Sequence, residues 1–211
     1  KRQDAELFKG RESEIRSIVQ MANEQQLTVV HGPDGIGLTS LMEAGVCPRL
    51  DMGETLALVI SDYPDLAGKL RSSLLASRLH IYLPSKDYLS PREVLDDAIH
   101  ICLRRGVNRI VLVLDQFERA LRLSSEHQVQ ICDMLVDLLD QTANIRVTLV
   151  VHDNWRDALE PWQQKLPALI TSRIPVGPAD QNAERISVPM SDKPKILIAD
   201  DDPDVIEQLT V

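Results

Sequence analysis

The sequence predicts an α/β domain in which a five-stranded, mostly parallel sheet lies between two layers of helices. Five short runs rich in apolar residues are typical of buried strands, and they lie at 27–30, 55–60, 110–114, 146–151 and 173–176. Segments with a helical spacing of apolar residues separate these runs, and this alternation is typical of parallel sheets whose strands are joined by helices. The 211 residues are enough for one such domain and a short further segment.

Composition and charge exclude several classes of protein. The chain is 44% hydrophobic and 26% charged, as soluble globular proteins are, and its net charge of −9 argues against a general nucleic-acid-binding surface. No apolar run reaches membrane-spanning length and no signal peptide is present, so we expect a cytoplasmic protein without membrane contact. The chain starts at Lys1 rather than Met, so we expect it to be a fragment. Cys47, Cys102 and Cys132 have no metal-ligand spacing and are expected to be buried or half-buried thiols in a reducing cytosol.

The first segment is a predicted turn followed by a helix. Gly10 can form the turn, and Ile15, Ile18 and Val19 give one apolar face that continues to about Asn23. On the residues alone, this is a surface turn that leads into an amphipathic helix.

A glycine-rich loop follows the first strand. Gly32 and Gly37 occupy the two glycine positions of the phosphate-binding pattern G-x-x-x-x-G-K-S/T. Glycines let the backbone wrap around an anion with its N–H groups inward, and the following helix adds the positive end of its dipole. Thr39 stands where the pattern places a Mg²⁺-binding hydroxyl, but Leu38 replaces the lysine. The candidate nucleotide-binding residues of the loop are Gly32, Pro33, Asp34, Gly35, Ile36, Gly37, Leu38, Thr39 and Ser40.

The middle of the chain contains a strand and two predicted helices. The strand at 55–60 is apolar throughout, and leucines spaced four residues apart then predict a helix over 66–77. Residues 79–83 fit either a short strand or an extended loop. Ser90, Pro91 and Glu93 form a good helix start, and Gly106 is expected to end that helix.

An acidic residue follows the next apolar strand. Asp115 comes directly after 110–114, which is the Walker B pattern, and the carboxyl ends of parallel strands are where ligands bind. A carboxylate there can hold Mg²⁺ through water. Gln116, which follows Asp115, is not acidic, so Glu118 is the nearest carboxylate that could polarise a water. Asp115 and Glu118 are therefore the candidate catalytic residues.

The last part of the domain is predicted to be a helix over 126–141, a strand over 146–151, a further helix and an edge strand over 173–176. Trp155 and Trp162 flank that further helix and are expected to be packing residues rather than a base-stacking platform.

Three segments resemble bacterial STAND-type NTPases and the related AAA+ proteins of the ASCE class. Residues 10–14 are similar to their G-R-E-x-E box, which lies beside the adenine and ribose. Residues 37–50 resemble their run from the glycine loop into the following helix, in which we expect Gly45 and Pro48 to end the helix. Residues 115–118 resemble their D-Q-F-E form of the Walker B segment.

This resemblance covers about residues 7–180 and implies a three-layer P-loop NTPase fold with strand order 5-1-4-3-2. It implies ATP or ADP as ligand, with Mg²⁺ held through Thr39 and Asp115, and it adds Gly10 and Arg11 to the nucleotide-binding residues. It places His152 and Asp153 near a residue that senses the γ-phosphate, although a solvated strand end explains them equally well.

Two functions follow from this reading. The favoured one is a nucleotide-binding signalling module whose degenerate Walker A loop makes it a weak or inactive NTPase, and the other is a competent ATP-hydrolysing switch. Because Leu38 replaces the lysine of the Walker A pattern, we expect very low intrinsic ATPase activity. The expected partners are signalling domains, and self-association stays open. Binding to DNA is not expected, since no basic recognition helix is visible.

The C-terminal residues predict a second module. We expect the NTPase domain to span 1–180, a linker to span 181–194 and a truncated domain to span 195–211. An apolar run that leads into Asp200 and Asp201 resembles the start of a response-regulator receiver domain. That resemblance implies that both aspartates help to bind Mg²⁺ and that the protein is part of a bacterial-type two-component system.

Overall fold

The computed structural model describes residues 10–88, 90–141 and 144–178. The predicted linker at 181–194 and the receiver-like segment, with Asp200 and Asp201, lie outside the described residues.

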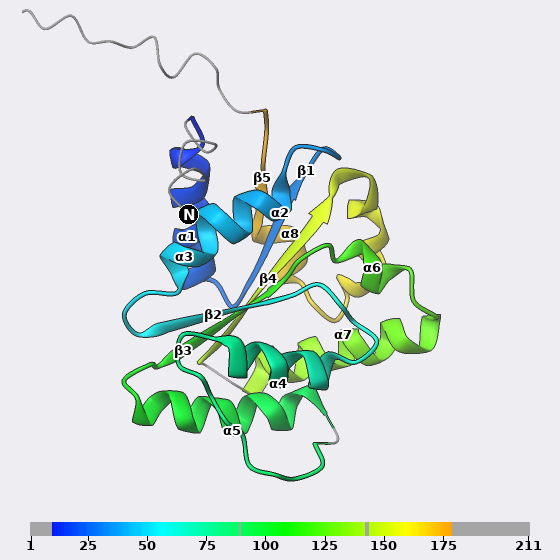
Figure 1. Ribbon diagram of the computed structural model, residues 1–211. Helices are drawn as coiled ribbons and strands as arrows, with labels where there is room; N and C mark the ends of the chain where they lie inside the picture. The colour runs from blue at the N-terminus through cyan, green and yellow to red at the C-terminus, as the bar shows by residue number, and fades with distance from the viewer. Residues whose placement is uncertain (1–9, 89, 142–143, 179–211) are drawn as a thin grey trace, which may run out of the picture. The chain divides into compact units, whose positions relative to one another are not determined.

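A five-stranded sheet runs through the centre of the domain (Figure 1). Its strands pair in the order β2-β3-β4-β1-β5, and every pairing is parallel. This is the predicted fold class with the predicted order. The strands are β1 (Leu27–Gly32), β2 (Thr55–Ile60), β3 (Arg109–Leu114), β4 (Ile145–His152) and β5 (Arg173–Pro175).

One face of the sheet is covered by α1 (Glu12–Glu24) and by the helical segment that follows the glycine loop. Val111 and Val113 of β3 point to this face, where they pack with Ile15 and Ile18 of α1 and with Leu41. Alternate residues of the same strand point to the other face, as the two-residue period of a strand requires.

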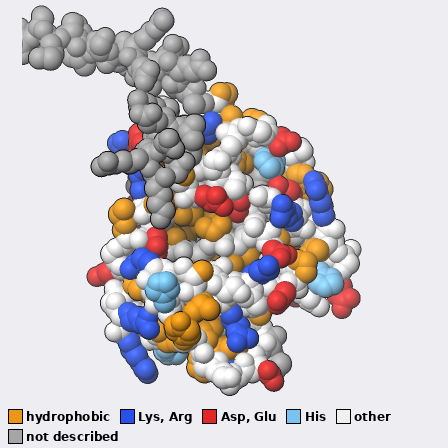
Figure 2. Space-filling view, in the orientation of Figure 1, with side chains coloured by type: hydrophobic (Ala, Val, Ile, Leu, Met, Phe, Trp, Pro, Cys, Tyr) orange, Lys and Arg blue, Asp and Glu red, His pale blue; other side chains and the backbone are white. Residues whose placement is uncertain are grey.

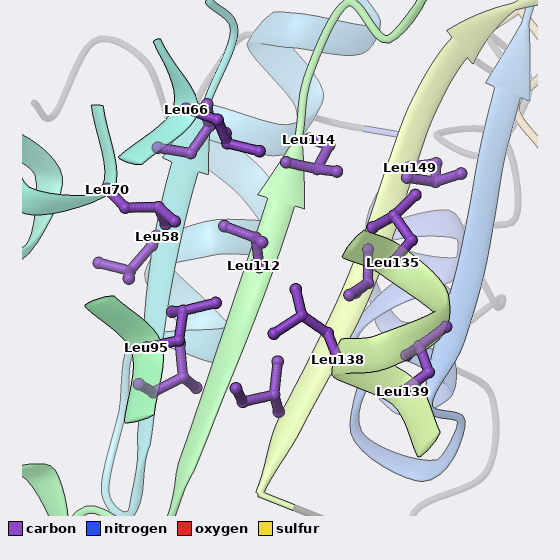
Figure 3. Close-up of a cluster of buried hydrophobic side chains, with 14 of the residues drawn as sticks. Leu58, Leu66, Leu70, Leu95, Leu112, Leu114, Leu135, Leu138, Leu139 and Leu149 are labelled. Carbon is purple, nitrogen blue, oxygen red and sulfur yellow. The ribbon is translucent and has the colours of Figure 1, made fainter. Parts of the chain in front are cut away.

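The second face carries the larger core, shown in Figure 3. Leucines of the strands pack there against α4 (Leu66–Ala76), α5 (Pro91–Arg104) and α7 (Ser125–Gln141). Leu58, Leu112 and Leu149 come from the strands, and Leu70 and Leu135 come from the helices. With helices on both faces, the domain has the three layers that the sequence predicts.

The helix after the glycine loop is longer than predicted. It runs as α2 (Leu38–Ser40), a π-helical turn η2 (Leu41–Val46) and α3 (Cys47–Leu50), so the expected stops at Gly45 and Pro48 are wrong. Gly45 is a packing position, since a Cβ there would lie 2.8 Å from Cδ1 of Ile15. Pro48 lies directly after the π-helical turn, at the second residue of α3.

Three further segments differ from the prediction or refine it. Residues 79–83 form a loop, anchored by the buried side chain of Ile81. The predicted helix that contains the two tryptophans is a 3₁₀ helix, η3 (Asp153–Trp162). Two short helices, α6 (Glu118–Leu121) and α8 (Ala168–Thr171), were not predicted. Trp162 is buried edge-on against Phe117, with ring centroids 5.5 Å apart, which confirms its packing role.

Within the described part of the chain, no helix combines the length and the apolar character that crossing a bilayer requires.

Candidate nucleotide-binding site

Three adjacent strands bring the predicted site residues to one edge of the sheet. Strands β3, β4 and β1 are neighbours, and Gly32 at the end of β1 pairs in register with His152 at the end of β4. Asp115 directly follows β3, beside them. The glycine loop, the Walker B aspartate and the end of β4 therefore surround one position, where the fold of open parallel sheets places ligands.

The glycine loop has the backbone conformation that its glycines were expected to allow. Gly35 and Gly37 have φ angles of 76° and 84°, in the left-handed region that side chains disfavour. Gly32 permits a close approach, since a Cβ there would lie 2.7 Å from the carbonyl oxygen of Val176. Pro33, Asp34 and Ser40 are exposed, and the helix begins at Leu38, so the loop and the helix N-terminus are placed as in a phosphate cradle.

Leu38 is part of the core beneath this position. Its side chain is only 3% exposed and packs in the core between the sheet, α1 and the helix after the loop. The residue that replaces the Walker A lysine has therefore become a core residue, and the loop has no cation at that place.

Asp115 and Thr39 are in contact. The Thr39 hydroxyl donates a hydrogen bond to the Asp115 carboxylate, which is 2% exposed. Burial raises the pKa of the Asp115 carboxyl, while hydrogen bonds from Thr39 and Gln116 oppose that rise. The second oxygen, Oδ1, is buried without a hydrogen-bond partner. Because Tyr63 Oη donates to the Asp115 backbone carbonyl at 2.7 Å, the strand end is held firmly in place.

A strained turn after Asp115 places the second candidate carboxylate. Gln116 has a φ of 52°, which non-glycine residues rarely adopt, and the Phe117 N–H donates to the Val150 carbonyl at 2.8 Å. The turn starts α6 and directs Glu118 inward, where it is 7% exposed. Oε1 of Glu118 lies 3.0 Å from Nδ1 of His152, and Oε2 is buried without a partner.

A small hollow lies between these groups. It is lined by both candidate carboxylates, the Thr39 hydroxyl and His152, and its volume of about 10 Å³ is close to what one water molecule needs. Oxygen ligands are what Mg²⁺ prefers, so the unpartnered oxygen of Asp115 and the hydroxyl of Thr39 fit a Mg²⁺ ion that is bound together with nucleotide phosphates.

The two sensor candidates, Asp153 and His152, each pair with a different residue: Asp153 with an imidazole and His152 with a carboxylate. Asp153 Oδ1 lies 2.7 Å from Nδ1 of His31, which is mostly buried. Nε2 of His152 lies 3.6 Å from Oδ1 of Asp34 in the glycine loop. Both residues lie at this edge of the sheet, where Asp153 is exposed and His152 is half-buried.

The box at 10–14 reaches the same edge through the end of β5. Gly10 has a φ of 91°, and Glu14 accepts a hydrogen bond from the Gly177 N–H at 3.2 Å. Arg11 is 8% exposed, and its Nη1 atom is buried without a hydrogen-bond partner. Because Val176 also lies against Gly32, the box and the glycine loop share one wall.

Sequence reasoning overlooked two residues of the site. Tyr63 comes from the loop after β2 and supports Asp115, and His31 is the last buried residue before the first loop glycine. Only the polar character of His31 at the end of an apolar strand could have marked it, whereas nothing in the sequence marks Tyr63.

Comparisons with known proteins give a family and a fold. The family model described as "Novel STAND NTPase 1" matches residues 1–193. Among curated proteins, none matches this chain.

Solved structures share the architecture at low sequence identity. A Walker-type ATPase of Pyrococcus abyssi matches with a TM-score of 0.61 and 17% identity over 82% of this chain and 54% of its own. The ORC2 protein of Aeropyrum pernix, solved in ADPNP-ADP complexes, matches with a TM-score of 0.57 and 15% identity over 79% of this chain and 47% of its own. The ORC1 protein of the same organism, solved in complex with DNA, has a TM-score of 0.53 and 16% identity over 80% and 45%. The chain therefore spans about half the length of these structures.

Proposed function

The chain belongs to the Novel STAND NTPase 1 family, and from that premise we propose that it is a signalling module that binds ATP or ADP weakly with Mg²⁺ and hydrolyses ATP very slowly. One observation carries the proposal. Thr39 lies beside Asp115, whose Oδ1 has no hydrogen-bond partner and could face Mg²⁺, while Leu38 is buried in the core. The half of the site that would hold the metal is thus kept, and the half that would hold the phosphates by charge is lost.

The energetic consequence is a weaker but not abolished affinity. A hydrogen bond to a charged group contributes about 1.5–3 kcal/mol, so losing the lysine lowers affinity roughly ten- to hundredfold. The glycine backbone and the helix N-terminus still favour an anion. Hydrolysis suffers more, because charge that develops on the transferred phosphate has lost its nearest cation.

Binding is tested by calorimetric titration of the protein with Mg²⁺ and ATP, and then with Mg²⁺ and ADP. We expect weak, saturable binding that falls about tenfold in Thr39→Val, which keeps the shape of the side chain and removes the hydroxyl. Thr171→Val is the matched control, since Thr171 is an exposed threonine at the end of α8. Absence of binding to the parent at millimolar ATP would refute the proposed function.

A competent ATP-hydrolysing switch is the second candidate, and Glu118 favours it. Its carboxylate lies beside the water-sized space with one oxygen free of hydrogen bonds. A turnover assay separates the two candidates. A rate of about 1 s⁻¹ that is lost in Asp115→Ala establishes the competent enzyme, and a rate indistinguishable from that variant establishes the weak module.

The output of the module is proposed to be two-component signalling, as the receiver-like segment at 195–211 suggests. Sequencing beyond Val211 tests this. A continuation into a receiver domain with an aspartate after its third strand supports the proposal, and a continuation without that aspartate refutes it.

A role in binding nucleic acid is not favoured. The net charge is −9, and Figure 2 shows Lys and Arg side chains interspersed with Asp and Glu over the face in view. Such a mixed surface does not offer the continuous positive field that phosphate backbones attract.

A further inference from the structure

The peptide bond between Asp115 and Gln116 is held from both sides. Its carbonyl oxygen, on Asp115, accepts a hydrogen bond from Tyr63 Oη at 2.7 Å. Its N–H, on Gln116, donates a hydrogen bond to the Asp115 carboxylate. Because the C=O and N–H of a planar trans peptide point in opposite directions, the bond from Tyr63 holds the peptide in the orientation that turns the N–H toward the carboxylate.

That orientation strains the next residue. Gln116 has a φ of 52°, in a region that non-glycine residues rarely adopt. A flip of the preceding peptide plane changes this φ by about 180°, which would return Gln116 to the extended region. The flip would also turn the Gln116 N–H away from the carboxylate and the Asp115 carbonyl toward it. The strained orientation therefore needs a contact that stabilises it, and Tyr63 provides one.

Two further aromatic rings fix the position of the Tyr63 ring. Tyr63 packs edge-on against Phe117 with ring centroids 5.6 Å apart, and Phe117 packs edge-on against Trp162 at 5.5 Å. All three side chains are buried. They come from segments that follow β2, β3 and β4, which are neighbours in the sheet. The stack therefore presents the Tyr63 hydroxyl to the Asp115 carbonyl from a rigid support.

The Asp115 carboxylate is oriented by the hydrogen bonds that it accepts. Its donors include the Thr39 hydroxyl, the Gln116 N–H and the Gln116 side chain. Oδ1 is buried without a hydrogen-bond partner, so these donors act on the other oxygen. The arrangement leaves Oδ1 available to a metal ion, and it depends on the direction of the Gln116 N–H.

We propose that Tyr63 is a positioning residue for the Mg²⁺ site. Its hydroxyl prevents a flip of the peptide between Asp115 and Gln116, and this keeps the Asp115 carboxylate oriented with Oδ1 free for the metal ion. The inference rests on the proposed function for the presence of the metal, and it adds a residue from outside the glycine loop and the Walker B segment. Tyr63 acts through Asp115, because its hydroxyl is committed to the backbone carbonyl.

The first test separates metal-dependent from metal-independent binding. Tyr63→Phe removes the hydroxyl and keeps the ring in its stack, and both proteins are titrated calorimetrically with ATP, once with Mg²⁺ and once with EDTA. We expect the variant to bind ATP with Mg²⁺ about three- to tenfold more weakly than the parent and to bind metal-free ATP as the parent does. Tyr88→Phe is the matched control and should change neither affinity, because Tyr88 Oη also donates to a partner, Oδ2 of Asp97 at 3.0 Å, in the loop before α5.

The second test needs no nucleotide. Amide hydrogen exchange measured by NMR follows the Gln116 N–H, which the carboxylate protects in the parent. Tyr63→Phe should speed exchange at Gln116 about tenfold more than at Val147, whose N–H donates to the Gln26 carbonyl at 2.8 Å and reports on the stability of the sheet. Gln116→Asn keeps an amide and tolerates a positive φ more readily, so in that background Tyr63→Phe should weaken Mg²⁺-dependent binding by about twofold or less.

The outcomes separate the inference from the proposed function. If Tyr63→Phe binds ATP with Mg²⁺ as tightly as the parent does, the inference is wrong and the proposed function stands. An equal loss with Mg²⁺ and with EDTA also refutes it, because the hydroxyl would then support the fold in general rather than the metal site. Exchange at Gln116 that rises no more than at Val147 shows, with or without nucleotide binding, that the hydroxyl does not hold the peptide.

A parent that binds no ATP refutes the proposed function and the metal-site part of the inference, while the exchange measurement still decides whether Tyr63 holds the peptide. A parent that binds ATP equally well with Mg²⁺ and with EDTA has no metal site for Tyr63 to position, and the inference then fails.

Discussion

Restoring the lysine at position 38 should trade folding stability for nucleotide affinity. The Leu38 side chain is 3% exposed and packs with Leu41 and Val113, so Leu38→Lys removes an apolar side chain from a formed core. Burial of a leucine contributes about 1.5–3 kcal/mol, part of which the methylene stem of lysine can retain. We therefore expect the nucleotide-free variant to lose about 1–2 kcal/mol of unfolding free energy.

The same change should strengthen binding. A charge-assisted hydrogen bond to the phosphates contributes about 1.5–3 kcal/mol, which corresponds to roughly a ten- to hundredfold gain in ATP affinity. Since a ligand at 100 times its dissociation constant stabilises by about 2.7 kcal/mol, saturating Mg²⁺ and ATP should return the variant to at least the stability of the parent.

Calorimetric titration gives the affinity, and denaturant unfolding with and without ATP gives the stability. Leu38→Met is the control, since a similar apolar volume costs less than about 1.5 kcal/mol and adds no charge. The reasoning fails if the folded lysine variant binds ATP no better than Leu38→Met. In that case the loop does not bind phosphates, and a protein-interaction role would explain the domain better.

Three further predictions follow from burial. Burial raises the pKa of the Asp115 carboxyl above its value in the unfolded chain, so the ionised group lowers the free energy of unfolding at neutral pH. Asp115→Asn should therefore be about 1 kcal/mol more stable at pH 7, and the difference should shrink as acid protonates the parent. Urea unfolding at pH 7 that shows a less stable variant would contradict this. Burial raises the pKa of the Cys47 thiol to about 12 and that of the Cys102 thiol to about 11, so both thiols stay protonated at pH 8. A disulfide reagent should therefore modify them slowly until guanidinium unfolds the chain. Rapid modification of both thiols in the native protein would exclude this. Gly45→Ala should cost about 1–3 kcal/mol of unfolding free energy, because the new Cβ would lie 2.8 Å from Cδ1 of Ile15. The cost should be smaller in the Ile15→Val background, which lacks that Cδ1 atom. Equal costs in both backgrounds would show that this contact is not the cause.

The sheet could be predicted from sequence because its strands are buried on both faces. Such strands are continuous apolar runs, and the polar residue after each run marks the strand end, as Asp115 and His152 do. The glycine loop could also be predicted, since its sequence pattern reflects the backbone conformation that Gly35 and Gly37 adopt.

The remaining features depend on contacts between distant segments, which a local pattern does not encode. Gly45 reads as a helix stop but is a site of close packing with α1. The direction of the Leu38 side chain follows from the core beneath it, and the pairing of His152 with Glu118 depends on a strained turn at Gln116. The sequence pattern therefore located the site, whereas the arrangement of its charged side chains could be known only from the folded structure.

Amide hydrogen exchange with and without saturating Mg²⁺ and ATP tests the central claim most directly, because it shows where the nucleotide binds. Binding at the glycine loop should slow exchange at residues 33–40, at 115–118 and at His152, and it should leave the exposed side of α5 unchanged. Thr39→Val provides the control and should lose most of that protection. The account is contradicted if saturating nucleotide leaves residues 33–40 unprotected or slows exchange only elsewhere in the chain.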